Sequence, residues 1–262
     1  MTTNSWRLTV EEMALLLSLR KQPELAQELL RAQLGPLTKE NVEGRLYAAG
    51  HTLMARGELA VAADGSIHVG EDLDLLANIL LDAAHSLRYT RSYRNAELLL
   101  TYHFYQDAIY EHQIEQGVVH EIKRVADVEA VAAGGVTFFG LTEASPGAFA
   151  PVEIAADVWS ELSAPQEYPQ LVAKARALGT LNGSAEWLAR DLMAANYRGA
   201  ALWIAYTEDK QPVSDHGFLL LNAPQRTWLV EPRQTEAGAV VRLQLCNAPL
   251  FTAKVQELCQ IA

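Results

Sequence analysis

The hydrophobic period of the sequence changes from helical to alternating at two places, and this constrains the fold more than any other feature. Up to residue 87, apolar residues recur at helical spacing, as Leu73, Leu76 and Ile79 do. From residue 95 to residue 125 they alternate every second residue, as strands require. The same succession returns after residue 150, with helical patterns followed by alternating ones. A chain with this order is expected to be α+β, with helices grouped apart from antiparallel strands.

The repeated order predicts two similar halves within one compact unit. We expect residues 1–140 and 141–262 each to form helices, then an antiparallel meander, then a helix. The linker candidate is "LTEASPGAFAPVE", residues 141–153, which contains two prolines. The first meander should use residues 95–106, 107–117 and 118–125. The second should use residues 199–207, 216–223, 227–233 and 239–246.

Local signals mark where several helices begin and end. Thr9 and Glu12 form a capping box before "MALLLSL". Thr38 is expected to cap a helix that ends near Gly57, and Ser184 a helix in the second half. Further helices are predicted for residues 23–33, 71–87, 127–135, 151–162, 168–179 and 248–260.

The stretch His51–Val69 has the pattern of a winged-helix module. A helix ends at Arg56-Gly57, and a short apolar segment, Asp64-Gly65 and "IHV" then follow. Asp-Gly between two apolar segments favours a hairpin. We expect this small winged-helix-like element to pack against the domain through its apolar residues, which are Leu53, Met54, Leu59, Val61, Ile67 and Val69.

The charge balance argues against nucleic-acid binding by this module. The formal net charge is −11. DNA-binding proteins need Lys and Arg to displace the counterions of phosphate groups. Residues 36–72 contain three basic residues against six acidic ones: Lys39, Arg45 and Arg56 against Glu40, Glu43, Glu58, Asp64, Glu71 and Asp72. We therefore expect no nucleic-acid partner.

The chain has the features of a cytoplasmic protein. The two cysteines, Cys246 and Cys259, make no disulfide framework, which favours a reducing compartment. Glu11 and Glu12 interrupt the region where a signal peptide would need an unbroken apolar core. No apolar run reaches the roughly 18 residues that a membrane span requires, so no membrane insertion is expected.

Sequence motifs for catalysis are missing. The sequence lacks the phosphate-binding, dinucleotide-binding, nucleophile-elbow and HExxH patterns, so no cofactor is expected. His112 should face His120 if the hairpin loop has three residues, and Glu121 if it has two. The first pairing could share a metal ion, but exposed sheet histidines explain both, and we expect no metal. An enzyme site built from His103, His112, His120 and Glu121 is a further alternative.

Several segments together resemble the EspG-type chaperones of type VII (ESX) secretion. They are "RLTVEEMALLLSL", then "AAGHTLMARGELAVAADGSIHVGEDLDLLANILL", then the meander "AELLLTYHFY…AIYEHQIEQGVVHEIKRV" and the closing residues 218–258. The resemblance covers nearly the whole chain as an order of elements. In that family the loop between the second and third strands helps to hold the client. Here that loop is only Glu115-Gln116-Gly117.

The resemblance implies a non-enzymatic binding protein that holds a small helical secreted protein. It also implies that the client is gripped near the central hairpin. Strand alternation places Tyr110, His112 and Ile114 on one face. The expected partner-binding residues are Tyr110, His112, Ile114, Val118 and His120. The alternatives are a winged-helix regulatory protein that binds a ligand or nucleic acid, and a relative that acts outside secretion. A homodimer is compatible with the sequence.

Overall fold

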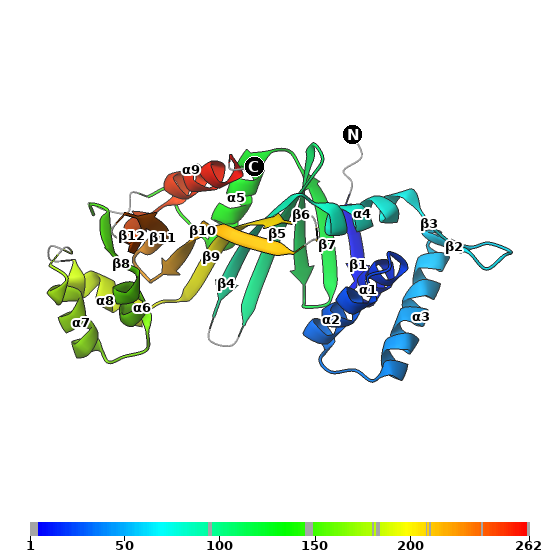
Figure 1. Cartoon of the computed structure of the whole chain (residues 1–262), viewed down its shortest axis with the longest axis horizontal. Coiled ribbons are helices and arrows are strands. Elements are labelled where there is room, and N and C mark those ends of the chain that lie inside the picture. Colours follow the sequence, from blue (N-terminus) through cyan, green and yellow to red (C-terminus); the bar gives the residue numbers. More distant parts are fainter. Residues whose placement is uncertain are drawn as a thin grey trace. The chain divides into compact units, whose positions relative to one another are not determined.

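The computed structural model describes residues 5–93, 96–144, 149–179, 181, 184–207, 209, 211–236 and 238–260, apart from the side chain of Asp215. The expected α+β class is confirmed, since helices and antiparallel strands fill the described chain (Figure 1). The chain divides into two compact units. Unit 1 is Met1–Ser86 with Thr101–Ala126, and unit 2 is Leu87–Leu100 with Asp127–Ala262.

Unit 1 begins with a short strand that leads directly into its first helix. Its helices are α1 (Val10–Leu19), α2 (Pro23–Leu34), α3 (Lys39–Ala55) and α4 (Glu71–Asp82). Its strands are β1 (Ser5–Thr9), β6 (Ala108–Glu115) and β7 (Val119–Val125), with the small pair β2 (Leu59–Val61) and β3 (Ile67–Val69). The strands β4 (His85–Ser92) and β5 (Glu97–Tyr105) are divided between the units. The expected capping box of Thr9 and Glu12 is present at α1, and Thr38 caps α3.

The strands of unit 1 are hydrogen-bonded in the order β1-β7-β6-β5. Trp6, Tyr110 and Ile122 lie on the face that packs against apolar residues of α1 and α4. Two strands of the first half were missing from the sequence prediction. Ser5–Thr9 pairs with β7 at the edge of the sheet, and His85–Ser92 begins inside the helix expected to reach residue 87. Alternation decides the second case, because Leu87 and Tyr89 are both fully buried.

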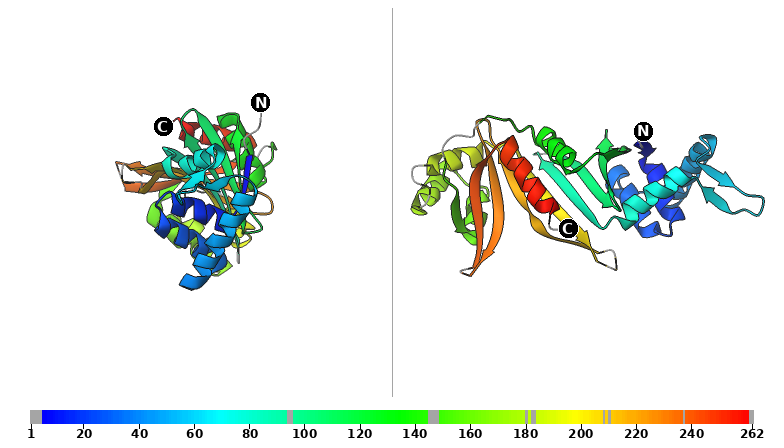
Figure 2. Two further views of the ribbon diagram at one scale, coloured as in Figure 1. Left: turned by 90° about the vertical axis from the view of Figure 1, so that its right-hand side faces the viewer. Right: turned by 90° about the horizontal axis from the view of Figure 1, so that it is seen from above.

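The wing forms as predicted, with Leu59 opposite Val69 and Val61 opposite Ile67. Its expected burial is only half right. Leu53 and Leu59 are buried, and Val69 packs against the same cluster. Met54, Val61 and Ile67 are exposed. The hairpin extends away from the helices of its own unit (Figure 2), so its tip lies beyond the reach of the core.

Along the chain, residues 152–259 repeat the order of residues 5–139, which is a short strand, helices, a meander and a helix. Unit 2 contains all of the second stretch and also the helix that ends the first. Its helices are α5 (Val128–Phe139), α6 (Ala156–Ser163), α7 (Tyr168–Ala177), α8 (Ala185–Met193) and α9 (Ala248–Cys259). Its strands are β8 (Val152–Ala155), β9 (Tyr197–Tyr206), β10 (Pro212–Asn222), β11 (Thr227–Thr235) and β12 (Gly238–Cys246). Together with β4 they are ordered β4-β9-β10-β11-β12-β8. The first residues of the helix expected over residues 151–162 form a strand instead. Val152 lies opposite Leu243, and this pairing with β12 places β8 at the edge of the sheet.

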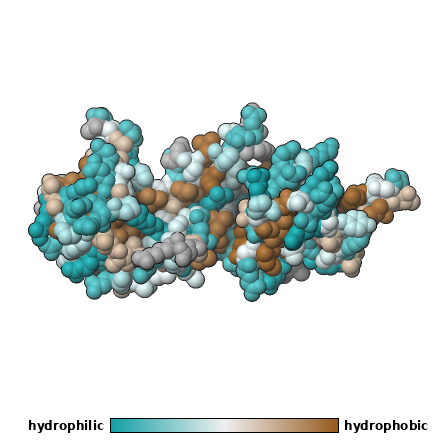
Figure 3. All heavy atoms as spheres, turned by 90° about the horizontal axis from the view of Figure 1, so that it is seen from below, coloured by the Kyte–Doolittle hydropathy of each residue, from teal (hydrophilic) through white to brown (hydrophobic). Residues whose placement is uncertain are grey.

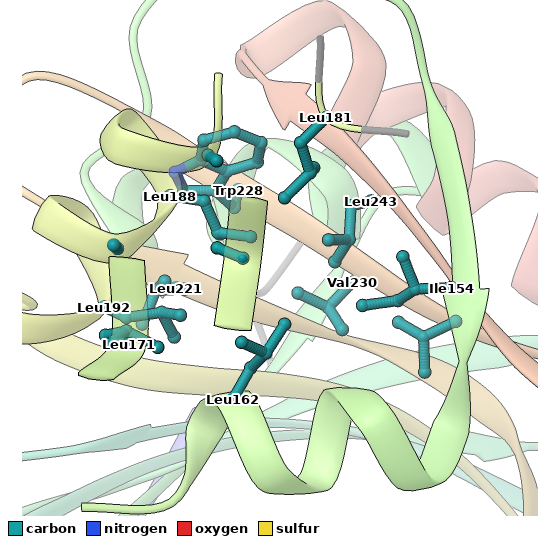
Figure 4. Close-up of a cluster of buried hydrophobic side chains, with 14 of the residues drawn as sticks. Ile154, Leu162, Leu171, Leu181, Leu188, Leu192, Leu221, Trp228, Val230 and Leu243 are labelled. Carbon is teal, nitrogen blue, oxygen red and sulfur yellow. The ribbon is translucent and has the colours of Figure 1, made fainter. Parts of the chain in front are cut away.

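Two cores lie on opposite faces of the unit 2 strands. Helices α6, α7 and α8 cover one face around Leu162, Leu188 and Trp228 (Figure 4). Phe218 contacts Phe251 of α9 on the other face. Residues 145–148 of the expected linker lie outside the described residues. Ser184 precedes α8 but makes no side-chain capping bond, because its backbone is already helical. Among the helices that the structure describes, none has the length and apolar character of a membrane span.

A buried carboxylate fixes α8 to the strands of unit 2. Asp191 is 3% exposed. It accepts hydrogen bonds from Arg226 Nη1 at 2.9 Å and from the Trp228 indole N–H at 2.9 Å. The Arg226 guanidinium lies over the ring of Trp187, 4.9 Å from its centroid. A carboxylate buried in this way must be paired, because an isolated buried charge is strongly unfavourable.

Replacing Asp191 with alanine should destabilise the fold strongly. The change leaves Arg226 and the Trp228 N–H without their acceptor, and breaking such a buried pair costs about 3–5 kcal/mol of unfolding free energy. Chemical denaturation monitored by tryptophan fluorescence measures this loss. Glu161→Ala at an exposed position of α6 is the control, with a loss below about 0.5 kcal/mol. Equal losses for the two variants would contradict the assignment.

Candidate partner-binding site

The five hairpin residues predicted to bind a partner differ widely in burial. Tyr110 is 6% exposed and packs against Trp6, with ring centroids 6.0 Å apart. His120 is 1% exposed, whereas His112 and Ile114 are half-buried. Val118 is 37% exposed and lies in the turn. In the isolated chain, Tyr110 and His120 are therefore core residues, and Val118 is the most accessible of the five.

The hairpin turn lies one residue later than predicted. Glu115 pairs with Val119, so the loop is Gln116, Gly117 and Val118. Gln116 and Gly117 both take positive φ, at 51° and 75°, and this tight turn allows Glu115 to stay in the strand. Neither expected pairing of His112 forms, because the later turn places His112 opposite Ile122. His112 and His120 are instead diagonal neighbours on one face.

Three imidazoles form a hydrogen-bonded line across β5, β6 and β7. His103 Nε2 lies 3.3 Å from His112 Nδ1, and His112 Nε2 lies 2.8 Å from His120 Nδ1. The line ends at Ser86 Oγ, 3.1 Å from His103 Nδ1, and at the Gln33 side chain, 3.0 Å from His120 Nε2. A neutral imidazole has one donor and one acceptor, so three neutral rings can bond head to tail. Gln33 belongs to α2, so the line ties this helix to the sheet.

Glu121 takes no part in this line. It pairs with Gln113 across the strands and lies on the opposite face, where Tyr102 donates to Glu111. The alternative enzyme site needs Glu121 beside the histidines, and the sheet separates them because adjacent residues of a strand face opposite ways. Among the described residues, no group of three or more His, Cys, Asp or Glu side chains is arranged to hold a metal ion.

Burial lowers the pKa of His120 from 6.5 to about 4. The cause is desolvation, since few water molecules reach the ring to stabilise the imidazolium. His120 is therefore neutral at pH 7, and a neutral ring fits the hydrogen-bonded line.

A second candidate surface is an apolar groove in unit 2. It has a volume of about 310 Å³ and lies between α6, α8 and strands β9 and β10. Its apolar lining includes Trp159, Leu192 and Leu219. Leu219 is 39% exposed in the middle of a strand whose neighbours Phe218 and Leu220 are buried. At the rim, Arg198 Nη2 donates to the carbonyl of Ser163 at 2.9 Å.

Sequence reasoning did not find this groove. The run Leu219-Leu220-Leu221 predicts a strand covered on both faces, because continuous apolar runs are typical of fully buried strands. Leu220 and Leu221 fit that reading at 1% and 3% exposure. Leu219 does not, because α6 and α8 leave this part of the sheet open. The groove can therefore be found only once the packing of α6 and α8 on the strands is known.

No family model matches the sequence, and neither does any curated protein. The fold is nevertheless similar to that of type VII secretion chaperones. The solved structure of EspG5 from Mycobacterium tuberculosis, in complex with a PE25-PPE41 dimer, matches with a TM-score of 0.67. The match covers 97% of this chain and 95% of the EspG5 chain at 14% sequence identity. The resemblance expected from the sequence is thereby confirmed for the fold.

Truncating Tyr110 should cost stability. Tyr110→Ala removes a large aromatic side chain from the cluster around Trp6, and such truncations cost about 3 kcal/mol or more. Thermal and denaturant unfolding measure the loss. Tyr47→Ala is the matched control in the same unit, because Tyr47 is 71% exposed. An unchanged melting temperature for Tyr110→Ala would contradict its assignment to the core.

Acid should destabilise unit 1 through His120. The unfolded state binds a proton near pH 6.5 and the folded state only near pH 4, so stability falls as the pH is lowered between these values and levels off below them. The full effect is on the order of 3 kcal/mol. His120→Gln should remove this part of the pH dependence, as measured by denaturant unfolding across the window. His68→Gln on the exposed wing should leave it intact, and the opposite result would refute the assignment.

Proposed function

We propose that this chain is a non-enzymatic cytoplasmic chaperone that holds a small helical secreted protein. The observation that carries the proposal is the fold likeness to EspG5 over 97% of the chain. EspG5 was solved in complex with the PE25-PPE41 dimer, and we infer a helical client of that kind here. Such a protein needs an accessible apolar surface and no cofactor.

The unit 2 groove supplies a surface of the right kind. Helical partners commonly bury their apolar side chains in a hydrophobic groove. A volume of about 310 Å³ suits a few side chains from the tip of a helical hairpin, rather than a whole helix. Leu219 and Trp159 offer apolar contact, and Arg198 at the rim can donate hydrogen bonds to the polar end of a helix. We propose that the client tip binds here.

The hairpin residues contribute differently under this proposal. Val118 is exposed at the turn, and Ile114 and His112 are half-buried beside it, so they can add contact area. Tyr110 and His120 are buried, so they would contribute indirectly by holding the strands of the hairpin in register. The short turn offers less surface than a long loop would, which favours the groove as the main contact.

The regulatory alternative receives less support. Each basic side chain of residues 36–72 is paired with a carboxylate: Lys39 with Glu43, Arg45 with Glu11, and Arg56 with Glu12 and Glu58. DNA phosphates would have to break these pairs before they could be bound. We therefore propose that no nucleic acid is bound, and a mobility-shift assay at low salt would reveal duplex binding if the proposal is wrong.

Client capture should depend on Leu219. Tagged chain carrying Leu219→Asp should recover at least about tenfold less client than wild type from a lysate of the native host, because a carboxylate would be buried at the contact. Mass spectrometry identifies the recovered proteins. Val213→Asp is the matched control, since Val213 lies on the same strand and is 46% exposed.

Three outcomes are informative. Recovery of a helical secreted protein by wild type and Val213→Asp, but not by Leu219→Asp, supports both the function and the groove. Equal recovery by all three proteins places the client elsewhere on the chain. Recovery of no secreted protein by wild type contradicts the chaperone proposal.

A further inference from the structure

The apolar face of the wing continues past the core that its base joins. Cross-strand pairing puts Leu59, Val69, Val61 and Ile67 on one face of the hairpin, because directly opposed residues share a face. At the base, Leu59 is 7% exposed and Val69 packs against the unit 1 cluster. At the tip, Val61 is 56% exposed and Ile67 is 50% exposed. One apolar strip is therefore covered at one end and bare at the other.

The helix that leads into the wing carries further exposed apolar side chains. Tyr47 is 71% exposed and Met54 is 38% exposed, seven positions apart on α3 and so on similar sides of the helix. In Figure 3 the wing, at the right of the view, shows apolar surface beside hydrophilic surface. Single exposed apolar residues are common on proteins, whereas apolar residues that are contiguous on the surface more often mark contact sites.

Acidic side chains lie close in sequence to the exposed apolar pair Val61 and Ile67. Asp64 lies in the turn of the wing, where bonds from Ser66 lower the pKa of its carboxyl group. Glu71 and Asp72 are exposed in the first turn of α4, directly after β3. The nearby Arg56 is already paired with Glu12 and Glu58. Arg20, which lies against α4, is paired with Asp74. An apolar strip with a negative surround selects for a partner that is both apolar and positively charged.

We propose that the wing, residues 59–69, is a docking surface for a basic amphipathic helix of another protein. Apolar side chains of that helix would cover Val61 and Ile67, while its Lys or Arg side chains would meet Asp64, Glu71 and Asp72. A second copy of this chain fits less well, because it would bring the same acidic groups to the contact. The surface shares no residue with the groove proposed for the client.

Two synthetic helical peptides with the same leucine face provide the test. One carries lysines on its polar face and the other carries glutamates. Binding to the full chain is measured by fluorescence anisotropy at two salt concentrations. We expect the lysine peptide to bind, more weakly at the higher salt concentration, and the glutamate peptide not to bind.

Variants locate the binding on the wing. The double variant Val61→Ser with Ile67→Ser should bind the lysine peptide about tenfold or more weakly than wild type, because two apolar contacts are lost. Glu71→Gln with Asp72→Asn should weaken it by a smaller factor and reduce its salt dependence. The matched control is Leu25→Ser with Val213→Ser, which removes two side chains of 44% and 46% exposure elsewhere. Circular dichroism confirms that each variant is folded.

The proposal is overturned by any of three results. The lysine peptide could bind the wing variant as tightly as wild type, which would mean adsorption to the acidic chain as a whole. Neither peptide could bind. Sedimentation velocity could also reveal a dimer that the wing substitutions abolish, which would make a second copy the occupant. A loss confined to the wing and charge variants supports the proposal.

Discussion

The Asp191 carboxylate holds together the part of unit 2 that contains the apolar groove. It joins α8 to β11 through Arg226 and Trp228, so it fixes one wall of the groove against its floor. A buried charge tolerates few alternative arrangements, because moving it away from its donors exposes an unpaired group to an apolar interior. The apolar cluster around Asp191 stabilises the unit, and the carboxylate fixes the position of α8 relative to the strands.

The line of imidazoles has a comparable role in unit 1. His103, His112 and His120 connect three strands, and Gln33 extends the connection to α2. Because each ring is hydrogen-bonded to its neighbours, the polar atoms on this buried face have partners. The histidines that first suggested a metal or enzyme site are thus explained as structural elements. The two surfaces that we propose for partners, a groove in unit 2 and a wing in unit 1, lie away from these histidines in the sequence and include none of them.

Local patterns were sufficient wherever neighbours along the chain decide the structure. The capping box at Thr9, the Asp-Gly wing and the alternating strands of both meanders all form as expected. Patterns failed where distant contacts decide. Ser5–Thr9 becomes a strand because β7 offers it an edge. Such a short segment has no clear strand pattern in its own sequence, since strand preference depends mostly on packing against a neighbouring strand.

By itself, the sequence determined the α+β class, the repeated order of elements and the acidic balance of residues 36–72, because period and charge are properties of the chain. The tertiary structure decided which apolar residues stay exposed. Leu219 and Ile67 look like core residues in sequence, and both lie open because no helix of their own unit covers them. The register of β6 on β7 was decided in the same way, since a turn one residue later places His112 opposite Ile122. Burial and register are relations between segments, so only the folded chain defines them.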